Sequence, residues 1–171
     1  MLFRSLDLYD NAPDMYASVD AKTACIVECN QTLINASGYT REEIIGRPIF
    51  DMYTPESAVF AREEILPTFL KTGKIEGAEF KLQRKDGSAI DVSLNVSALR
   101  DSHGNIISSR SSWRDISEQK QLEKDRFEME QQLFQAQKME SLGTLSAGIA
   151  HDFNNLQFQI LGYTQLDRKS V

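Results

Sequence analysis

The residues best suited to chemistry lie near the C-terminal end, where a histidine is followed by an aspartate and, four positions on, an asparagine. Apolar residues recur around them in a heptad pattern, at Leu142, Ile149, Phe153, Leu156, Ile160 and Tyr163. On such a helix His151 takes the outward f position, and Asn155 shares its face. An imidazole keeps one neutral, nucleophilic nitrogen near pH 7. The pattern therefore predicts a solvent-facing histidine with a nucleophilic ring nitrogen.

The sequence around this histidine resembles the phosphoacceptor box of sensor histidine kinases. The matching run extends from Gln137 to Leu156, within a wider resemblance over 135–166, and includes the subgroup spelling His151-Asp152-Phe153-Asn154-Asn155. The resemblance implies that His151 accepts the phosphoryl group and that Asp152 acts as acid/base and holds the ring tautomer. It also implies that Asn155 positions water for dephosphorylation of the partner regulator. The alternative is ordinary polarity on a helix surface.

The segment before this box predicts a long helix. From 117 to 141 it contains neither glycine nor proline and is dominated by Glu, Gln, Lys and Leu, which favour helix. Leu122, Met129 and Ala136 fall at d positions of a heptad and Leu133 at an a position, while Arg126 weakens the seam. A helix over 117–166 would be about 75 Å long and not stable in isolation. We therefore expect a parallel homodimer.

The two heptads are out of step by one residue. The first places a d position at Gly143, whereas the second places it at Leu142. Either the seam has a phase slip, which changes how two helices wind around each other, or it simply drifts.

The rest of the chain predicts an α+β fold, because short segments of mixed pattern are separated by glycine and proline. We expect strands over 15–19, 25–29, 76–84, 89–99 and 106–114, and helices over 30–37, 40–46 and 56–70. Thr40 and Glu43 have the spacing of a capping box. Pro67 predicts a kink or an early end in the third helix.

This order of elements, together with several short motifs, resembles the PAS family over about residues 5–117. The motifs are Asn30-Gln31, the run from Gly38 to Gly46, Arg84-Lys85-Asp86-Gly87-Ser88 and Trp113-Arg114-Asp115-Ile116-Ser117. The resemblance implies a five-stranded antiparallel sheet with small helices, and a pocket between them. In the family that pocket holds haem, a flavin, a small organic molecule or nothing.

The composition changes at Asp115-Ile116-Ser117, which we expect to couple the signal from the sensor to the helix. Asp115 or Ser117 is the predicted N-cap. The alternative role for the Asp115 carboxylate is an ion pair with a nearby arginine, such as Arg114 or Arg100.

Three domains are predicted from these patterns. They are a PAS sensor domain over 1–116, a coiled-coil signalling linker over 117–140, and over 141–171 the first helix of a truncated histidine-phosphotransfer domain. We expect the chain to lack the ATP-binding domain of its parent kinase, because it has no Gly-rich phosphate loop. ATP would act only through that missing domain, and the chain alone would be inactive.

The sequence names no ligand for the pocket, although its residues argue against two cofactors. Haem needs an axial ligand, and the histidine outside the signalling helix, His103, falls in a predicted turn. A photoactive flavin needs a reactive cysteine, which Asn30-Gln31-Thr32 does not supply. A small organic molecule stays possible. Aromatic residues that either line such a pocket or fill the core are Phe50, Tyr53, Phe60 and Phe69.

Two cysteines, Cys25 and Cys29, are expected on one strand, where residues four apart lie roughly 13 Å from each other. That exceeds the reach of a disulfide. We expect two buried thiols; a redox pair would require a helix instead.

The formal net charge of −6 argues against a nucleic-acid partner. No apolar run approaches the ~18–20 residues of a membrane span, and no secretory signal is evident, so a cytoplasmic location is expected. The expected function is the sensor and phosphoacceptor portion of a two-component kinase. Its expected partners are its own copy, a response-regulator receiver domain and the ATP-binding domain. The alternative is a non-catalytic PAS interaction module with a scaffold helix.

Overall fold

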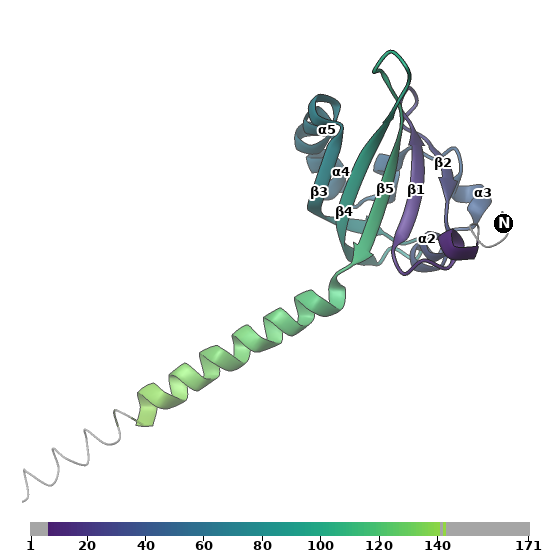
Figure 1. The fold of residues 1–171 in the computed structure, drawn as a ribbon. Helices are drawn as coiled ribbons and strands as arrows, with labels where there is room; N and C mark the ends of the chain where they lie inside the picture. Colours follow the sequence, from purple (N-terminus) through teal and green to yellow (C-terminus); the bar gives the residue numbers. More distant parts are fainter. Residues whose placement is uncertain (1–6, 141, 143–171) are drawn as a thin grey trace, which may run out of the picture. The chain divides into compact units, whose positions relative to one another are not determined.

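Alternating apolar and polar residues build an antiparallel sheet of five strands in the computed structural model, which describes residues 7–140 and 142. The strands are β1 (Met15–Asp20), β2 (Ile26–Cys29), β3 (Lys74–Gln83), β4 (Ala89–Arg100) and β5 (Ile106–Asp115). Their order across the sheet is β2-β1-β5-β4-β3, so the first and last strands lie side by side (Figure 1). The predicted α+β class and five-stranded antiparallel sheet are confirmed.

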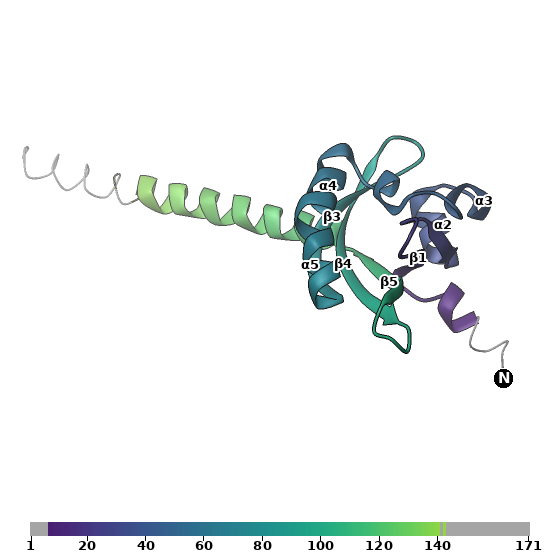
Figure 2. The same cartoon turned by 90° about the horizontal axis from the view of Figure 1, so that it is seen from above.

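The helical segments between β2 and β3 pack against the sheet (Figure 2), whereas a short helix over 7–10 precedes β1. They are α2 (Gln31–Ser37), α3 (Arg41–Ile44), the 3-10 helix η1 (Ile49–Met52), α4 (Pro55–Phe60), the π-helical turn η2 (Ala61–Ile65) and α5 (Leu66–Thr72). Side chains of both layers form the core, and the largest fully buried ones are Trp113, Ile26, Leu33, Ile44, Met52, Leu82, Ile90 and Val92. Burial of each such aliphatic side chain stabilises the fold by about 1.5–3 kcal/mol.

Asn30 joins the start of the fold to its first helix. Its side-chain oxygen accepts hydrogen bonds from the backbone N–H groups of Leu33, at 3.1 Å, and Tyr16, at 2.9 Å. Its amide nitrogen donates to the carbonyl oxygens of Tyr9 and Asp14. The side chain is fully buried, and these bonds satisfy its whole capacity, so it caps α2 without a desolvation penalty.

The helix that carries Pro67 does not end early at the proline but is interrupted before it. α4 passes into the π-helical turn η2, and α5 then continues through Pro67 to Thr72. Proline has no N–H to donate to the preceding turn, and a wider turn lets the helix continue without that bond. The structure thus has an interruption before the proline rather than an early end.

The predicted long helix is confirmed over 117–140. The chain divides into two units, Met1–Lys120 and Gln121–Val171, so most of this helix belongs to the second unit. Its large apolar side chains are exposed, including Leu122, Phe127, Met129 and Leu133. Within residues 7–140 and 142, no helix has the length and apolar character that a membrane span requires.

Three details differ from the expected elements. The second strand begins at Ile26 instead of Cys25, because Cys25 forms only an isolated bridge to Pro48. Cys29 is buried but Cys25 is half-buried, so the expectation of two buried thiols holds for one. The 3-10 helix η1 was not predicted, since four residues are too few to show a helical period.

Candidate functional site

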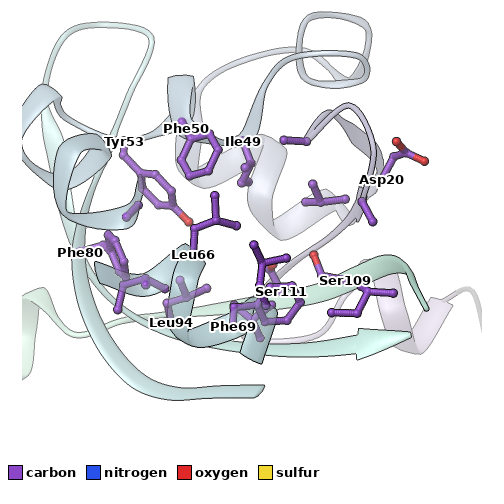
Figure 3. Close-up of a pocket in the computed structure, with 18 residues that line it drawn as sticks. Asp20, Ile49, Phe50, Tyr53, Leu66, Phe69, Phe80, Leu94, Ser109 and Ser111 are labelled. Carbon is purple, nitrogen blue, oxygen red and sulfur yellow. The ribbon is translucent and has the colours of Figure 1, made fainter. Parts of the chain in front are cut away.

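An apolar pocket lies between the inner face of the sheet and the segment that runs from η1 to α5. Its volume is about 120 Å³. All strands except β2 contribute to its lining, and so do η1, η2 and α5. Figure 3 shows the side chains gathered around the cavity, with Tyr53, Phe50 and Phe80 towards one side and Phe69 beside Ser111 towards the other. The helix interruption at η2 therefore lies in the wall of the pocket.

The aromatic wall is held by contacts between buried side chains. Tyr53 stacks on Phe80 with ring centroids 4.9 Å apart, and its oxygen accepts a hydrogen bond from Trp113 Nε1 at 3.0 Å. Burial raises the pKa of Tyr53 above its usual range, so the phenol stays protonated. Its O–H hydrogen has no acceptor among the described residues. The wall thus presents a neutral donor.

The floor of the pocket carries two serine hydroxyls. Ser109 and Ser111 lie on the same face of β5 and are 9% and 6% exposed. Neither hydroxyl has a hydrogen-bond partner among the described residues. Both hydroxyl oxygens remain accessible, because the fully buried side-chain polar atoms without a partner in the described residues are those of Tyr9 and Arg47. The position of the two serine hydroxyls in an otherwise apolar lining marks them as the polar groups that a bound molecule would meet.

Three of the four predicted aromatic residues line the pocket: Phe50, Tyr53 and Phe69. Phe60 does not line it, is partly exposed, and packs on the far side of Phe80, with ring centroids 5.6 Å apart. The serines were missed from the sequence. Their signal was the spacing of two that places them on the same strand face as Trp113, but serine alone does not indicate a pocket lining.

The junction residues Asp115, Ile116 and Ser117 connect the last strand to the long helix. Asp115 Oδ1 accepts a hydrogen bond from the Ser117 N–H at 2.8 Å, so Asp115 takes the predicted capping role. The Ser117 hydroxyl instead accepts from the backbone N–H of Asp91 at 3.3 Å. Ile116 N–H donates to the Asp91 carbonyl oxygen at 2.9 Å. The start of the helix is thus bonded to the neighbouring strand β4.

A charged network that the sequence did not predict secures the first helical turn. Lys120 Nζ lies 3.0 Å from Asp91 Oδ1 and 2.8 Å from Glu79 Oε2, and Lys81 Nζ lies 3.5 Å from Asp91 Oδ2. The hydrogen bond from Lys120 lowers the pKa of Asp91, and those to Glu79 and Asp91 raise the pKa of Lys120. Asp91 and Lys120 therefore stay charged at neutral pH, and the network joins β3, β4 and the helix start.

The arginines expected beside Asp115 have other partners. Arg114 makes a forked contact with Asp14, with Nε–Oδ1 at 3.0 Å and Nη2–Oδ2 at 2.9 Å. Arg100 donates to the carbonyl oxygen of Gly104 at 2.8 Å. The predicted pairing of Asp115 with Arg114 or Arg100 is therefore wrong, because adjacent residues on a strand point to opposite faces and Arg100 lies near the other end of the sheet.

His103 lies in the turn between β4 and β5, where Asp101 organises the backbone. It is exposed and is not among the residues that line the pocket. Across the described part of the chain, no cluster of three or more His, Cys, Asp or Glu side chains could hold a metal ion. His151, Asp152 and Asn155 lie outside the described residues.

A family model described as a PAS domain matches residues 13–118, well over half of the chain. The signal transduction histidine-protein kinase AtoS from Escherichia coli (strain K12) is 26% identical over 170 residues. That alignment covers 96% of this chain and 25% of AtoS, so the chain spans about a quarter of the length of this relative.

Similar folds occur among solved structures. The PAS domain of a protein from Colwellia psychrerythraea superposes with a TM-score of 0.62 at 20% identity, covering 68% of this chain and 98% of that one. The light-state structure of the blue-light photoreceptor Aureochrome1 LOV gives a TM-score of 0.56 at 25% identity, covering 70% and 91%.

Proposed function

The chain belongs to the PAS domain family, as its motifs predicted, and we propose that it is the sensor and phosphoacceptor portion of a two-component histidine kinase. In this proposal the pocket receives the signal, the helix that begins at residue 117 carries it, and His151 accepts the phosphoryl group. The partners are a second copy of the chain, the ATP-binding domain of the parent kinase and a response-regulator receiver domain. The predicted cytoplasmic location stays a prediction.

The observation that carries the proposal is the course of strand β5. Ser109 and Ser111 line the pocket, Asp115 ends the same strand, and the helix begins two residues later. A change in the pocket that shifts β5 therefore acts directly on the first helical turn. Asp91 and Lys120 bond that turn to the sheet, so the helix start follows movements of the strands.

The similarity to AtoS supports the kinase part of the proposal. Its alignment covers nearly the whole chain, whereas the PAS match ends at residue 118. The similarity thus extends beyond the sensor into the segment with the predicted phosphoacceptor box. Within this box we assign the acceptor nitrogen to His151, control of its tautomer to Asp152, and positioning of water for phosphatase activity to Asn155.

The phosphoacceptor is tested in a kinase that contains this chain, the second helix and the ATP-binding domain. His151→Gln should abolish acid-labile phosphate after incubation with ATP, because an amide has no nucleophilic ring nitrogen. His103→Gln is the matched control and should be labelled normally, since this histidine lies in an exposed turn of the sensor. Undiminished labelling of His151→Gln would refute the assignment.

We propose dimerisation through the predicted heptad seam, and the helix offers a matched pair to test it. Leu122, at a d position, is 62% exposed, and Phe127, at a b position outside the seam, is 59% exposed. In light scattering of the whole chain, Leu122→Glu should shift the mass towards a monomer and Phe127→Glu should not. Equal effects of the two substitutions would contradict this seam.

Signal coupling is assigned to Asp115, Ile116 and Ser117. Asp115→Ala removes the acceptor for the Ser117 N–H and should leave basal phosphorylation of the kinase intact while altering its response to signal. An unchanged response would remove Asp115 from the coupling path.

A further inference from the structure

We propose that the pocket binds a compact, uncharged and mainly apolar organic molecule that carries one hydroxyl or carbonyl group. This inference rests on the proposed sensor function and names the class of molecule that the sensor receives. Three properties of the lining lead to it: the size of the cavity, the absence of a group that could compensate a ligand charge, and the placement of its hydroxyls.

The size of the cavity limits the ligand to a few heavy atoms. Its volume is about 120 Å³. An apolar protein cavity of about 150 Å³ takes up benzene, so this pocket suits a single ring or a similarly compact chain. A haem or an isoalloxazine ring system is several times larger. The walls are aliphatic and aromatic, formed by residues such as Ile65, Leu66 and Leu94, so most of the ligand surface would contact carbon.

The lining offers no countercharge. Among the described residues that line the pocket there is no lysine, arginine or histidine, and Asp20 is the sole acidic residue. Asp20 lies at the rim, with its carboxylate directed away from the centre of the cavity in Figure 3, where it accepts from the N–H groups of Lys22 and Thr23. Arg62 stacks on the Phe50 ring but does not line the pocket. Burial of an unpaired charge is strongly unfavourable, so the ligand is neutral.

The hydroxyls define where the polar group of the ligand lies. Ser109 and Ser111 are more than nine-tenths buried on the floor and have no partner among residues 7–140. The Tyr53 O–H, whose oxygen is occupied by Trp113, keeps its hydrogen free to donate from the wall. A hydroxyl or carbonyl oxygen can accept from these groups, whereas a fully apolar ligand would leave them unpaired.

The test uses four seven-carbon probes of similar shape on the whole chain: benzyl alcohol, toluene, benzoate and benzylamine. Trp113 is the single tryptophan and donates to Tyr53, so its fluorescence reports an occupied pocket. Ligand-observed NMR measures binding independently. Benzyl alcohol should bind most tightly, and the charged probes should bind at least about tenfold more weakly because the site cannot compensate their charge.

Variants of neighbouring serines locate the polar contact. Ser109→Ala or Ser111→Ala should weaken the binding of benzyl alcohol by about three- to tenfold, which is the effect of losing one hydrogen bond. The affinity for toluene should not change. Ser112→Ala is the matched control on the opposite face of β5 and should change neither the affinity for benzyl alcohol nor that for toluene. Circular dichroism establishes that each variant is folded.

Three outcomes would overturn the inference. They are no binding of benzyl alcohol up to its solubility, tighter binding of benzoate or benzylamine, or loss of affinity that is equal for Ser111→Ala and Ser112→Ala. A flavin or haem in native mass spectrometry of the purified chain would also overturn it. None of these outcomes affects labelling of His151, so failure of this inference is distinguishable from failure of the proposed function.

Discussion

The pocket part and the junction part of strand β5 differ in whether their polar groups have partners. At the pocket end, Ser109 and Ser111 are buried in an apolar lining without a partner in the described structure. At the junction end, Asp115 caps the helix, and Asp91 accepts hydrogen bonds from Lys120 and Lys81. The serine hydroxyls in the pocket thus lack hydrogen-bond partners, whereas the charged groups at the junction have theirs.

The proposed function requires one strand both to sense and to transmit, and this difference between its two parts supports that role. The pocket gains free energy when a molecule satisfies its hydroxyls, whereas the junction holds the helix start through interactions present without a ligand. If all polar groups of the strand were already paired, a ligand would gain no hydrogen bond from it. A strand that was unpaired at both ends would not hold the helix. The predictions below test whether the two ends differ energetically as described.

The largest effect is expected in the wall of the pocket. Tyr53→Phe removes the acceptor of the buried Trp113 Nε1–H and should lower the free energy of unfolding by about 1–3 kcal/mol. Urea denaturation measures this. Tyr39→Phe is the control, because the Tyr39 hydroxyl has no hydrogen bond among the described residues, and its effect should be much smaller. Equal losses of unfolding free energy in the two variants would show that the hydrogen bond from Trp113 to Tyr53 does not account for the effect.

A smaller effect is expected at the junction. Asp91→Asn keeps the shape of the side chain but removes the charge that pairs with Lys120 and Lys81. Because Asp91 and Lys120 are partly exposed, the loss should be about 0.5–1 kcal/mol and should shrink in high salt. Asp51→Asn, at an exposed aspartate that makes no ion pair within the described chain, should be near neutral. A salt-independent loss would contradict an electrostatic origin.

The same network predicts a pH dependence. The pKa of Asp91 is lowered in the fold, so its contribution is present above its unfolded value of about 3.9 and is lost as the pH falls through the folded value. The pKa of Lys120 is raised, so its contribution is present below about 10.4 and is lost as the pH rises through the folded value. Urea midpoints of the wild type and Asp91→Asn should converge below about pH 3.9, and a constant difference would exclude this linkage.

The smallest effect is expected on the floor of the pocket. Without a ligand, Ser111→Ala removes a buried hydroxyl that has no partner in the described structure, so stability should change by no more than about 0.5 kcal/mol and can increase. Thermal unfolding with and without benzyl alcohol measures this. Loss of stabilisation by the ligand, with unchanged stability in its absence, would show that Ser111 acts in ligand binding whereas Asp91 acts in stability. A large ligand-free loss would mean that the hydroxyl is structural.

The fold was predictable because its signals are local. The alternation of Ile90, Val92 and Leu94 shows the inward face of β4, and the capping spacing of Thr40 and Glu43 marks the start of α3, where Glu43 Oε2 accepts from the Thr40 N–H at 2.9 Å. Each of these patterns depends on residues within a few positions of one another. These patterns can therefore be recognised without knowledge of the tertiary structure.

The candidate site was only partly predictable because its contacts are distant in sequence. Asp91 and Lys120 are 29 positions apart, and no spacing rule relates a strand residue to a helix residue across a sheet. Ser109 and Ser111 have a regular spacing, but serine does not reveal which face of a strand it occupies. By contrast, Asp115 was identified correctly as a cap, since the backbone group that it serves lies only two residues on.

The π-helical turn η2 gives this family member a simple route to new ligand preferences. A π turn contains one residue more than an α turn, so a deletion within 61–65 would restore a regular helix. The deletion would remove one residue from the stretch in which Ala61 and Ile65 line the pocket, while the regular helix that it restores would keep Leu66 and Phe69 in register. The sheet and the helix junction would keep their sequence. A single-codon deletion could thus change the pocket wall at η2 during evolution while the sequence of the helix junction is inherited unchanged.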